Sequence, residues 1–518
     1  MSPDIRKYII DALRFGNTKE EIADSLLVAG WDLNDIQSAF VDVGISVNPL
    51  GAKKTSGFKK AFIATSFAVV ILTASTAYLW NDRIDLSKTN ELAVQDFYTE
   101  LTESQISFSD AGEMVFPDEQ KFITQKNEYV ASGTDFIEVD LRKMEITLFD
   151  NGASIGTVAV LSKGKEGSWW ETPTGNYKVL GKTPNGYSSI GNVWMPYSIQ
   201  FYGNYLIHGW PHYDDGTPVR KGYSGGCIRL SDDDARTVYN FVNNSTPILV
   251  LEDKERHDFG VLTQRVTDAP IDGIDAKAFL ITDISTGNVL LEKNAEDVMP
   301  IASLTKLMTA IVAHEVIYLG KSITVSERML ANVAQAFHPV VSKRYLGLDL
   351  LYPLLMQSSN DSANVLASFI GNNSFMRNMN NKAASLDMNN TTFVDPSGIG
   401  AQNISTTEDV AKMLQYIYFN RNFLFDIGRG VEFKNIGSIN LGRTVNISDL
   451  KNFNEFVDRP DLIGVKNGQT TAARETMATV WNIKTKSGDV PVSIVVLGSE
   501  DREADTDVLI KWVKKNYE

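Results

Sequence analysis

The sequence predicts a multidomain α+β protein with one membrane-spanning helix. Its 518 residues exceed a single core, because hydrophobic cores stop growing at roughly 250–300 residues. Residues 61–80 form a run without a charged side chain. Strand-like alternation near residues 136–160 gives way beyond residue 276 to a mixture of hairpin and helix patterns. We therefore expect a membrane segment followed by two globular units.

The composition is typical of a globular protein, with 43% hydrophobic and 22% charged residues. A net charge of −15 argues against a nucleic-acid partner, because phosphate binding needs a basic surface. The single cysteine, Cys227, allows no internal disulfide and is free to react. The five histidines are scattered, and no set of His, Cys and carboxylates has metal-ligand spacing. We expect neither a metal nor another cofactor.

Residues 1–45 predict three short amphipathic helices. Ile5, Ile9 and Leu13 recur at helical spacing, and Thr18 with Glu21 forms a capping box. The segment loosely resembles a ubiquitin-associated-type three-helix module. A small binding module and a simple cap on the membrane segment are equally compatible with it. Residues 46–60 form a polar linker containing Gly and Pro.

Residues 61–80 can cross a bilayer core of about 30 Å at 1.5 Å per helical residue. Lysines precede the run and acids follow it, so we expect the N-terminus in the cytoplasm, a single pass through the plasma membrane and the remaining chain outside. A cleaved signal and a buried soluble helix are the alternatives. Sixty preceding residues argue against a signal. Residues 81–133 predict an acidic spacer, helical near 91–101 and irregular afterwards.

Residues 134–252 predict a β-rich domain. Apolar side chains alternate along 136–141, 146–148 and 158–160, with turn residues between them, which indicates antiparallel strands. A helix is expected at about 232–243. Three tryptophans of this domain could line a substrate groove or fill the core, and the sequence leaves both open: Trp169, Trp170 and Trp194.

The stretch from His208-Gly209 to Ser224-Gly-Gly-Cys227-Ile-Arg229 contains the candidate thiol site. A thiol becomes a strong nucleophile when an imidazole takes its proton, and glycines let backbone N–H groups approach a reacting carbonyl. A lone cysteine is otherwise most often a small buried hydrophobe.

The thiol motif resembles the L,D-transpeptidase family, in which a His-Gly pair precedes Ser-His-Gly-Cys, an apolar residue and Arg or Asn. Residues 136–141, 172–177 and 195–196 extend the likeness. The resemblance implies that Cys227 is the nucleophile, His208 the base, and Gly226 and Arg229 substrate-binding. Gly225 stands where the family has His, so reduced activity remains open. His212 is a loop residue in this interpretation.

Residues 253–275 form a linker to the second unit, 276–518. Segments 278–283 and 289–293 predict a hairpin. We expect Pro300 to open a helix that carries Ser303 and Lys306. Positions i and i+3 share a helix face, so a desolvated Lys306 could activate the Ser303 hydroxyl.

Two further motifs support this site, namely Ser358-Ser-Asn360 and Lys466-Asn-Gly468-Gln469. Their order resembles the serine D-alanyl-D-alanine carboxypeptidases, a branch of the penicillin-binding proteins with a β-lactamase-like α/β fold. The resemblance implies a role for each residue: Ser303 as nucleophile and Lys306 as base, Ser358 in proton relay, and Asn360, Lys466, Gly468 and Gln469 in substrate binding. Asn467 replaces the family's usual Thr, which puts substrate affinity in question. His314 and His338 are expected to be structural or surface residues.

Together these features predict a membrane-anchored, bifunctional enzyme of cell-wall biogenesis. Peptidoglycan stem peptides would be its substrates and β-lactams its inhibitors. Because both sites depart from the family pattern, two alternatives stay open. One is a scaffold that binds stem peptides without turnover, and the other is a D,D-carboxypeptidase or endopeptidase with an inactive thiol domain.

Overall fold

The computed structural model describes residues 119–517, apart from 189, 253–261, 263–270, 272, 331–335, 434, 437–438, 441–442 and 487, together with Phe40. The described part from residue 119 onwards belongs to one compact unit, 105–518. The predicted helical module, its linker, the membrane span and most of the spacer lie outside the described residues. Within the described part, no helix is both long and apolar enough to cross a membrane.

Helix α5 (Glu119–Ala131) occupies the end of the segment expected to be an irregular spacer, so that expectation was wrong for these residues. Its Phe122 packs with Tyr129 on a small cluster that includes Phe136 and Phe149, and these last two rings stack at 4.2 Å. The helix therefore belongs to the β-rich domain. We call residues 119–252 the thiol domain.

The first sheet of the thiol domain has the strand order β3-β2-β1-β9-β4. Its first three strands form the predicted antiparallel meander, whereas β9 returns from the far end of the domain to pair parallel with β1. Their bounds are β1 (Phe136–Asp140), β2 (Glu145–Asp150), β3 (Ala153–Ala159), β4 (Gly175–Lys178) and β9 (Pro247–Leu251).

The second sheet of this domain has the strand order β5-β6-β7-β8, and Cys227 directly precedes β8. Parallel pairing of β7 with β8 sets His208 opposite Arg229. The bounds are β5 (Gly181–Ser188), β6 (Val193–Tyr202), β7 (Tyr205–His208) and β8 (Ile228–Arg229). The predicted helix follows as α6 (Asp232–Phe241), capped by the Ser231 hydroxyl. Buried side chains of both sheets and of α6 form one core.

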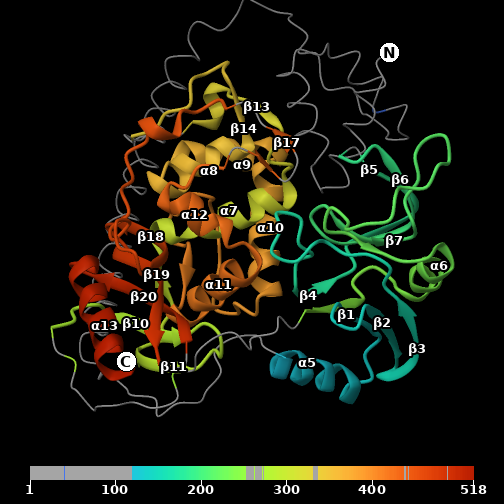
Figure 1. Ribbon diagram of the computed structural model, residues 1–518, viewed down its shortest axis with the longest axis horizontal. Coiled ribbons are helices and arrows are strands. Elements are labelled where there is room, and N and C mark those ends of the chain that lie inside the picture. Colours follow the sequence, from blue (N-terminus) through green and yellow to red (C-terminus); the bar gives the residue numbers. More distant parts are fainter. Residues whose placement is uncertain are drawn as a thin grey trace, which may run out of the picture. The chain divides into compact units, whose positions relative to one another are not determined.

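The second unit, which we call the serine domain (residues 273–517), has a five-stranded antiparallel sheet of order β11-β10-β20-β19-β18. Strand β20 is buried almost throughout, as expected when helices cover both faces of a sheet. Figure 1 shows α13 on one side of this sheet and α11 on the other. The bounds are β10 (Ala278–Asp283), β11 (Val289–Lys293), β18 (Leu462–Thr470), β19 (Arg474–Thr485), β20 (Gly488–Ser499), α11 (Thr407–Asn420) and α13 (Arg502–Tyr517).

The helical part of the serine domain carries the motifs that contain Ser303 and Lys306, and Ser358 and Asn360. The prediction that Pro300 opens a helix was wrong, because Pro300 pairs with Ile404 in a short strand. A 3₁₀ turn (Ala302–Leu304) then leads into α7. The remaining elements are β12 (Met299–Pro300), α7 (Thr305–Val316), β13 (Ser322–Thr324), β14 (Arg344–Leu346), α8 (Gly347–Met356), α9 (Asn360–Ile370), α10 (Asn372–Ser385), β15 (Ile404–Ser405), α12 (Phe423–Arg429), β16 (Asn435–Ile436) and β17 (Ile439–Asn440), with 3₁₀ turns at Glu327–Met329 and Ile447–Asp449.

Candidate active sites

Cys227 lies in the loop that leads into β8, one residue before the strand begins. Its Sγ donates to the carbonyl of Asn204, 3.7 Å away, in the turn between β6 and β7. Burial raises the pKa of the Cys227 thiol, while the Leu206 backbone and the Arg229 charge oppose that rise. The thiol is therefore held in its neutral form.

His208 ends the neighbouring strand β7 and is buried. Its Nδ1 lies 2.6 Å from the carbonyl of Gly209. A carbonyl can only accept, so this contact assigns the proton to Nδ1 and leaves Nε2 as the basic nitrogen. Burial lowers the pKa of His208 to about 4. No hydrogen bond joins His208 to Cys227 in the part of the chain that the structure describes. Cys227 is thus a neutral thiol and His208 a neutral base.

The loop before Cys227 is held by its own polar contacts. Gly226 has φ +102°, and a Cβ there would lie 2.3 Å from the ring of Tyr205, so glycine is required. Its N–H donates to the Ser224 hydroxyl at 3.0 Å, and its carbonyl accepts from the Thr172 hydroxyl at 2.9 Å. The orientation of the Gly226–Cys227 peptide thus depends on Thr172.

Arg229 and Gly225 complete this site. The Arg229 guanidinium lies over the Trp210 ring, 5.6 Å from its centroid, and its buried Nε has no hydrogen-bond partner. The guanidinium charge favours the Cys227 thiolate. At Gly225, where the resembling family has His, an added Cβ would meet no atom within 4 Å. The site therefore has room for a side chain that this sequence does not supply.

The contacts of Trp194, His212 and Trp169 show where these predicted residues of the thiol domain lie. Trp194 Nε1 donates to Asp214, and the backbones of Trp194 and His212 pair with each other, which supports the assignment of His212 to a loop. Trp169 stacks on Phe423 of the serine domain at 3.9 Å. Trp169 therefore lies neither in a groove nor in the core of the thiol domain, because it packs where the two domains meet.

Ser303 lies on the 3₁₀ turn before α7, and Lys306 on the first turn of that helix. Lys306 Nζ is 2.8 Å from Ser303 Oγ and also donates to the carbonyl of Ser397. Complete burial lowers the pKa of Lys306 to about 7, and the charge of Asp395 only partly opposes this. A large fraction of Lys306 is therefore an unprotonated amine near neutral pH, able to accept the Ser303 proton. The predicted pairing of these two residues is confirmed.

Strand β18 lies directly against this turn. A Cβ added to Gly468 would lie 2.7 Å from the Ser303 nitrogen and 2.6 Å from the Thr476 hydroxyl. Lys466 on the same strand is buried, and its pKa is lowered well below normal, first by desolvation and then by the nearby charge of Lys306. Lys466 and Gly468 thus lie with the Ser303–Lys306 pair, as predicted.

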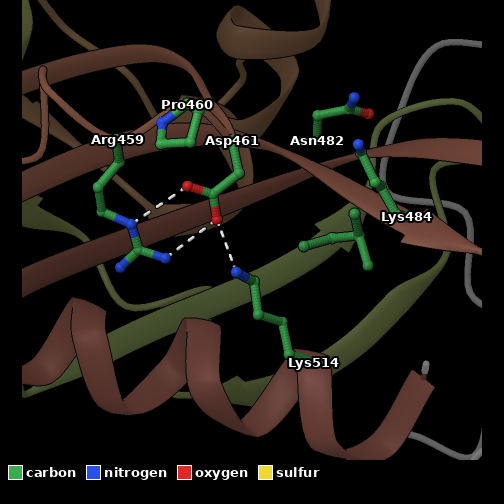
Figure 2. Close-up of a pocket in the computed structure, with 7 residues that line it drawn as sticks. Arg459, Pro460, Asp461, Asn482, Lys484 and Lys514 are labelled. Atoms are coloured by element: carbon green, nitrogen blue, oxygen red, sulfur yellow. Dashed lines mark hydrogen bonds and ion pairs between the residues drawn. The ribbon is translucent and has the colours of Figure 1, made fainter.

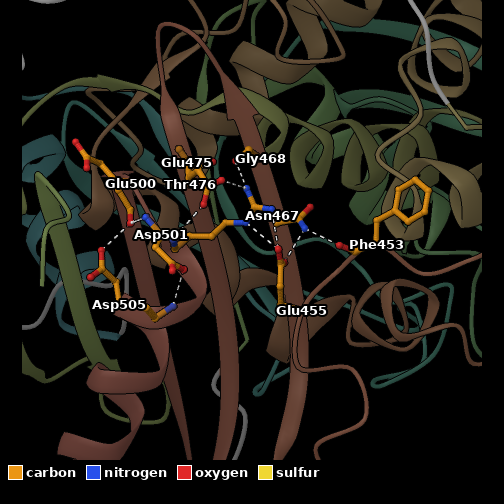
Figure 3. Close-up of polar contacts among 12 residues, drawn as sticks. Phe453, Glu455, Asn467, Gly468, Glu475, Thr476, Glu500, Asp501 and Asp505 are labelled. Atoms are coloured by element: carbon orange, nitrogen blue, oxygen red, sulfur yellow. Dashed lines mark hydrogen bonds and ion pairs between the residues drawn. The ribbon is translucent and has the colours of Figure 1, made fainter. Parts of the chain in front are cut away.

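Asn467 on β18 belongs to a polar network around Glu455 (Figure 3). Arg502 belongs to the same network, and sequence reasoning missed it. The Asn467 amide donates to Glu455 at 2.7 Å and to the Phe453 carbonyl at 2.8 Å. Arg502, the first residue of α13, binds Glu455 at 2.6 Å and the Gly468 carbonyl at 3.2 Å. Arg502 is 34 positions beyond Gly468, so only the fold brings them together.

The remaining predicted residues lie at the margins of this cluster. Ser358 joins α8 to α9 with φ +56°, a strained value for a non-glycine residue, and its buried hydroxyl has no hydrogen-bond partner. Asn360 is the first residue of α9, whose cap is Ser359. Gln469 is exposed on β18, at the edge of the sheet. The structure places no direct contact between Ser358 and Ser303 among the described hydrogen bonds.

His314 and His338 form no described hydrogen bond with Ser303, Lys306 or Cys227. His314 is buried in α7 at the meeting of the two domains, where burial lowers its pKa to about 3. His338 is half exposed and contacts Asp361 at 3.0 Å. Both fit the expectation of structural or surface residues. No cluster of three or more metal-ligating side chains occurs among the described residues.

A pocket of about 420 Å³ lies near the start of β18, at the end of that strand away from Gly468 (Figure 2). Asp461 at its wall contacts Arg459 at 3.0 Å and Lys514 at 2.7 Å, which lowers the pKa of Asp461 to about 2. Asp461 precedes β18, and Gly468 lies roughly 20 Å further along that strand at 3.3 Å per residue. None of the predicted catalytic residues lines this pocket.

Comparison with known proteins separates the chain in the same way. Residues 134–250 match the model of the L,D-transpeptidase catalytic domain, and residues 263–501 match that of the D-alanyl-D-alanine carboxypeptidase. A D-alanyl-D-alanine endopeptidase of Pseudomonas aeruginosa is 37% identical over 26% of this chain and 45% of its own length.

An endopeptidase of the same description from Escherichia coli is 35% identical over 29% of this chain and 50% of its length. The D-alanyl-D-alanine carboxypeptidase DacF of Bacillus subtilis is 25% identical over 47% of this chain and 63% of its length. The chain thus spans about half the length of these relatives.

Proposed function

We propose that this chain, which joins an L,D-transpeptidase catalytic domain to a D-alanyl-D-alanine carboxypeptidase domain, is a membrane-anchored enzyme with two acyl-transfer sites for peptidoglycan stem peptides. The observation that carries the proposal is the Ser303–Lys306 pair, with 2.8 Å between Oγ and Nζ and a Lys306 pKa of about 7. A buried amine at that distance can take the hydroxyl proton as the ester forms.

At the serine site, Ser303 Oγ attacks the carbonyl of the penultimate D-Ala while Lys306 accepts the proton. The C–N bond breaks, the departing D-Ala takes a proton, and water hydrolyses the ester. Arg502 places a cation beside β18, the strand that contacts Ser303, and a bound terminal carboxylate would favour the protonated, charged form of the buried Lys466 amine on that strand. The two side chains would then supply the positive field that a terminal carboxylate requires.

At the thiol site, Cys227 attacks a stem carbonyl and forms a thioester, which the amine of a second stem then cleaves to give a cross-link. The neutral thiol and neutral His208 assign proton removal to the moment of attack, with Nε2 as acceptor. Arg229 then stabilises the thiolate.

The two products connect the sites. Trimming of a pentapeptide stem leaves a tetrapeptide, the donor that an L,D-transpeptidase uses. Holding both sites on one chain raises the effective concentration of that tetrapeptide at Cys227. Anchoring by residues 61–80, with both sites outside the plasma membrane, would keep them near the peptidoglycan.

Mass spectrometry of the full-length protein after incubation with a penicillin and, separately, a carbapenem tests the proposal. We expect an adduct on Ser303 with the first and on Cys227 with the second. Single Ser303→Ala and Cys227→Ala variants should each lose one adduct and one product, free D-Ala or cross-linked dimer. Absence of both adducts would favour the stem-binding scaffold instead.

A second candidate for the serine site is cleavage of existing cross-links, because the relatives at 37% and 35% identity are described as endopeptidases. Incubation with purified pentapeptide monomers and with D,D-cross-linked dimers separates the two activities. Release of D-Ala from monomers supports the carboxypeptidase. Conversion of dimers to monomers, with monomers left intact, supports the endopeptidase and would leave Cys227 without a donor made by Ser303.

A further inference from the structure

The thiol site and the serine domain share a set of buried contacts. Asn420, the last residue of α11, donates its amide to the Glu171 carboxylate at 2.8 Å. The neighbouring Arg421 donates to the backbone carbonyl of Glu171 at 3.3 Å. Glu171, Arg421 and Asn420 are all buried. These bonds cross from one domain to the other and end one residue away from Thr172.

Thr172 continues the contacts to the nucleophile. Its buried hydroxyl donates to the Gly226 carbonyl at 2.9 Å. A trans peptide is planar, so the direction of the Gly226 carbonyl also sets the direction of the Cys227 N–H. That N–H belongs to the residue proposed as nucleophile, and in the proposed reaction it would donate to the oxyanion that develops during carbonyl attack. A shift of Glu171 would therefore rotate the group on which acylation depends.

A second set of contacts links Cys227 to the serine domain. The carbonyl of Asn204 accepts from Cys227 Sγ, and the side chain of Asn204 donates to the Val316 carbonyl at 2.8 Å. Val316 is the last residue of α7, the helix whose first turn carries Lys306. The thiol is thus supported by the serine domain at two separate places.

The partners on the serine-domain side are themselves anchored. Arg421 forms a 2.8 Å ion pair with Glu315, and Glu315 also contacts Lys382 at 3.2 Å, with all three side chains fully buried. Lys382 lies 3.8 Å from the centre of the Tyr416 ring. Buried, mutually paired charges of this kind hold one geometry. Arg421 is therefore a rigid support for Glu171.

We propose that Asn420 and Arg421 are positioning residues of the thiol site: they act through Glu171 and Thr172 to orient the Gly226–Cys227 peptide for acylation. The serine domain thereby completes the site of the thiol domain. The inference builds on the proposed function, since it concerns attack by Cys227 on a carbonyl.

Two reagents separate positioning from simple loss of structure. Acylation by a carbapenem needs the oxyanion donors, whereas alkylation by iodoacetamide needs only the thiolate. Cys227 is the single cysteine of the chain, so the alkyl adduct can be assigned from intact mass, whereas the carbapenem adduct is assigned to Cys227 or Ser303 by peptide mass spectrometry. The full-length protein is compared with Asn420→Leu, which keeps the volume and removes the amide donor. Asn516→Leu is the matched control, because the Asn516 amide is buried and bonds within α13.

In Asn420→Leu we expect the carbapenem acylation rate of Cys227 to fall roughly tenfold, as small displacements from a reactive geometry commonly do. Alkylation at pH 8 should stay within twofold or rise, and penicillin acylation of Ser303 should be unchanged. The control should match the wild type in all three rates. Equal ratios of acylation to alkylation in Asn420→Leu and wild type would overturn the proposal.

Thr172 provides a second route if Asn420→Leu does not fold. Thr172→Val removes the hydroxyl at nearly constant volume and should reproduce the selective loss of acylation, and Thr172→Ser should restore it. A Val variant with unimpaired acylation would contradict the proposal. If the wild type reacts with iodoacetamide but with no carbapenem, the transpeptidase function fails. That outcome would also overturn the positioning role, which serves acylation by Cys227, whereas a reactive wild type with unimpaired variants would overturn the positioning role alone.

Discussion

The pKa of the buried Lys306 amine sets the pH range in which the serine site can work. Its pKa of about 7 results from desolvation, with Asp395 opposing the shift only in part. Since the attacking step needs the unprotonated amine, the reaction should slow as the pH falls below that value. The acylation rate should therefore rise with pH, whereas the rate of a site that needs a charged lysine would fall.

The penicillin acylation rate of Ser303 should rise with pH and reach half its plateau near pH 7, the pKa of Lys306. Stopped-flow or quenched mass spectrometry between about pH 5.5 and 9 measures this. Lys306→Gln should reduce the rate by at least about 10²-fold, the lower range for a general base. A wild-type rate independent of pH over this interval would show that another group is the base.

Asn467 offers a second test at this scale. Its amide is held by Glu455 and the Phe453 carbonyl, so the position presents no hydroxyl to a substrate carboxylate. We expect Asn467→Thr to lower KM for a pentapeptide roughly fivefold, about 1 kcal/mol for one gained hydrogen bond, with kcat nearly unchanged. Asn467→Val is the control of similar shape without the hydroxyl, and an equal improvement in both would attribute the gain to loss of the Glu455 contact.

At the scale of elements, β18 and the turn at Ser303 form one packed unit. Gly468 allows the strand to approach the Ser303 backbone within van der Waals contact, and Ala302 before the nucleophile adopts φ +47°. A non-glycine residue with positive φ stores strain that the surrounding packing must maintain. The strand therefore helps to hold the nucleophile.

Replacing Gly468 with Ala should push β18 away from Ser303, because the new Cβ would lie 2.7 Å from the Ser303 nitrogen. We expect penicillin acylation to fall about tenfold, as for other displaced reactive groups. Alkylation of Cys227 should not change. Gly156→Ala on β3 is the control, since its new methyl group would have no atom within 4 Å. Wild-type acylation in Gly468→Ala would show that the strand can yield without moving Ser303.

Local pattern was sufficient for elements whose partners are near in sequence. The meander β1–β3, the hairpin β10–β11 and the Ser303–Lys306 pair were predicted from turn chemistry and from the i, i+3 spacing. The parallel pairing of β1 with β9 could not be, because it joins strands more than a hundred positions apart. Pro300 was misassigned for the same reason, since its partner Ile404 is equally distant.

The contacts between the domains escaped prediction for a different reason. Glu171 and Arg421 look like ordinary solvent-exposed charges in the sequence, and only the fold buries both. Glu315 did carry a signal, because it and His314 interrupt the apolar second half of α7. A carboxylate in such a position requires a partner, but the sequence does not say which cation supplies it.

For the whole molecule, these charges imply that the thiol and serine domains unfold together. Arg421→Met would leave Glu315 with Lys382 as its remaining described cationic partner, together with the Tyr416 hydroxyl, and would remove the bond to Glu171. Breaking a buried ion pair costs about 3–5 kcal/mol. The described residues from 119 onwards belong to one compact unit, so the loss should be shared.

Two probes on the full-length protein test this cooperativity. On heating, exposure of Cys227 to iodoacetamide and loss of penicillin binding at Ser303 should have the same midpoint. Arg421→Met should lower both midpoints equally, by several degrees. Arg236→Met is the control, because Arg236 pairs only at the surface with Asp233. Midpoints that separate in the wild type would mean that the domains are independent.

The buried pairing of Glu315, Arg421 and Glu171 also constrains how such a gene can evolve. Exchange of either domain for a homologue that lacks the matching residue would leave the Glu171 carboxylate without the Asn420 amide, or Asn420 without Glu171, inside the protein. A shared interior of this kind therefore favours inheritance of the two halves as a single block.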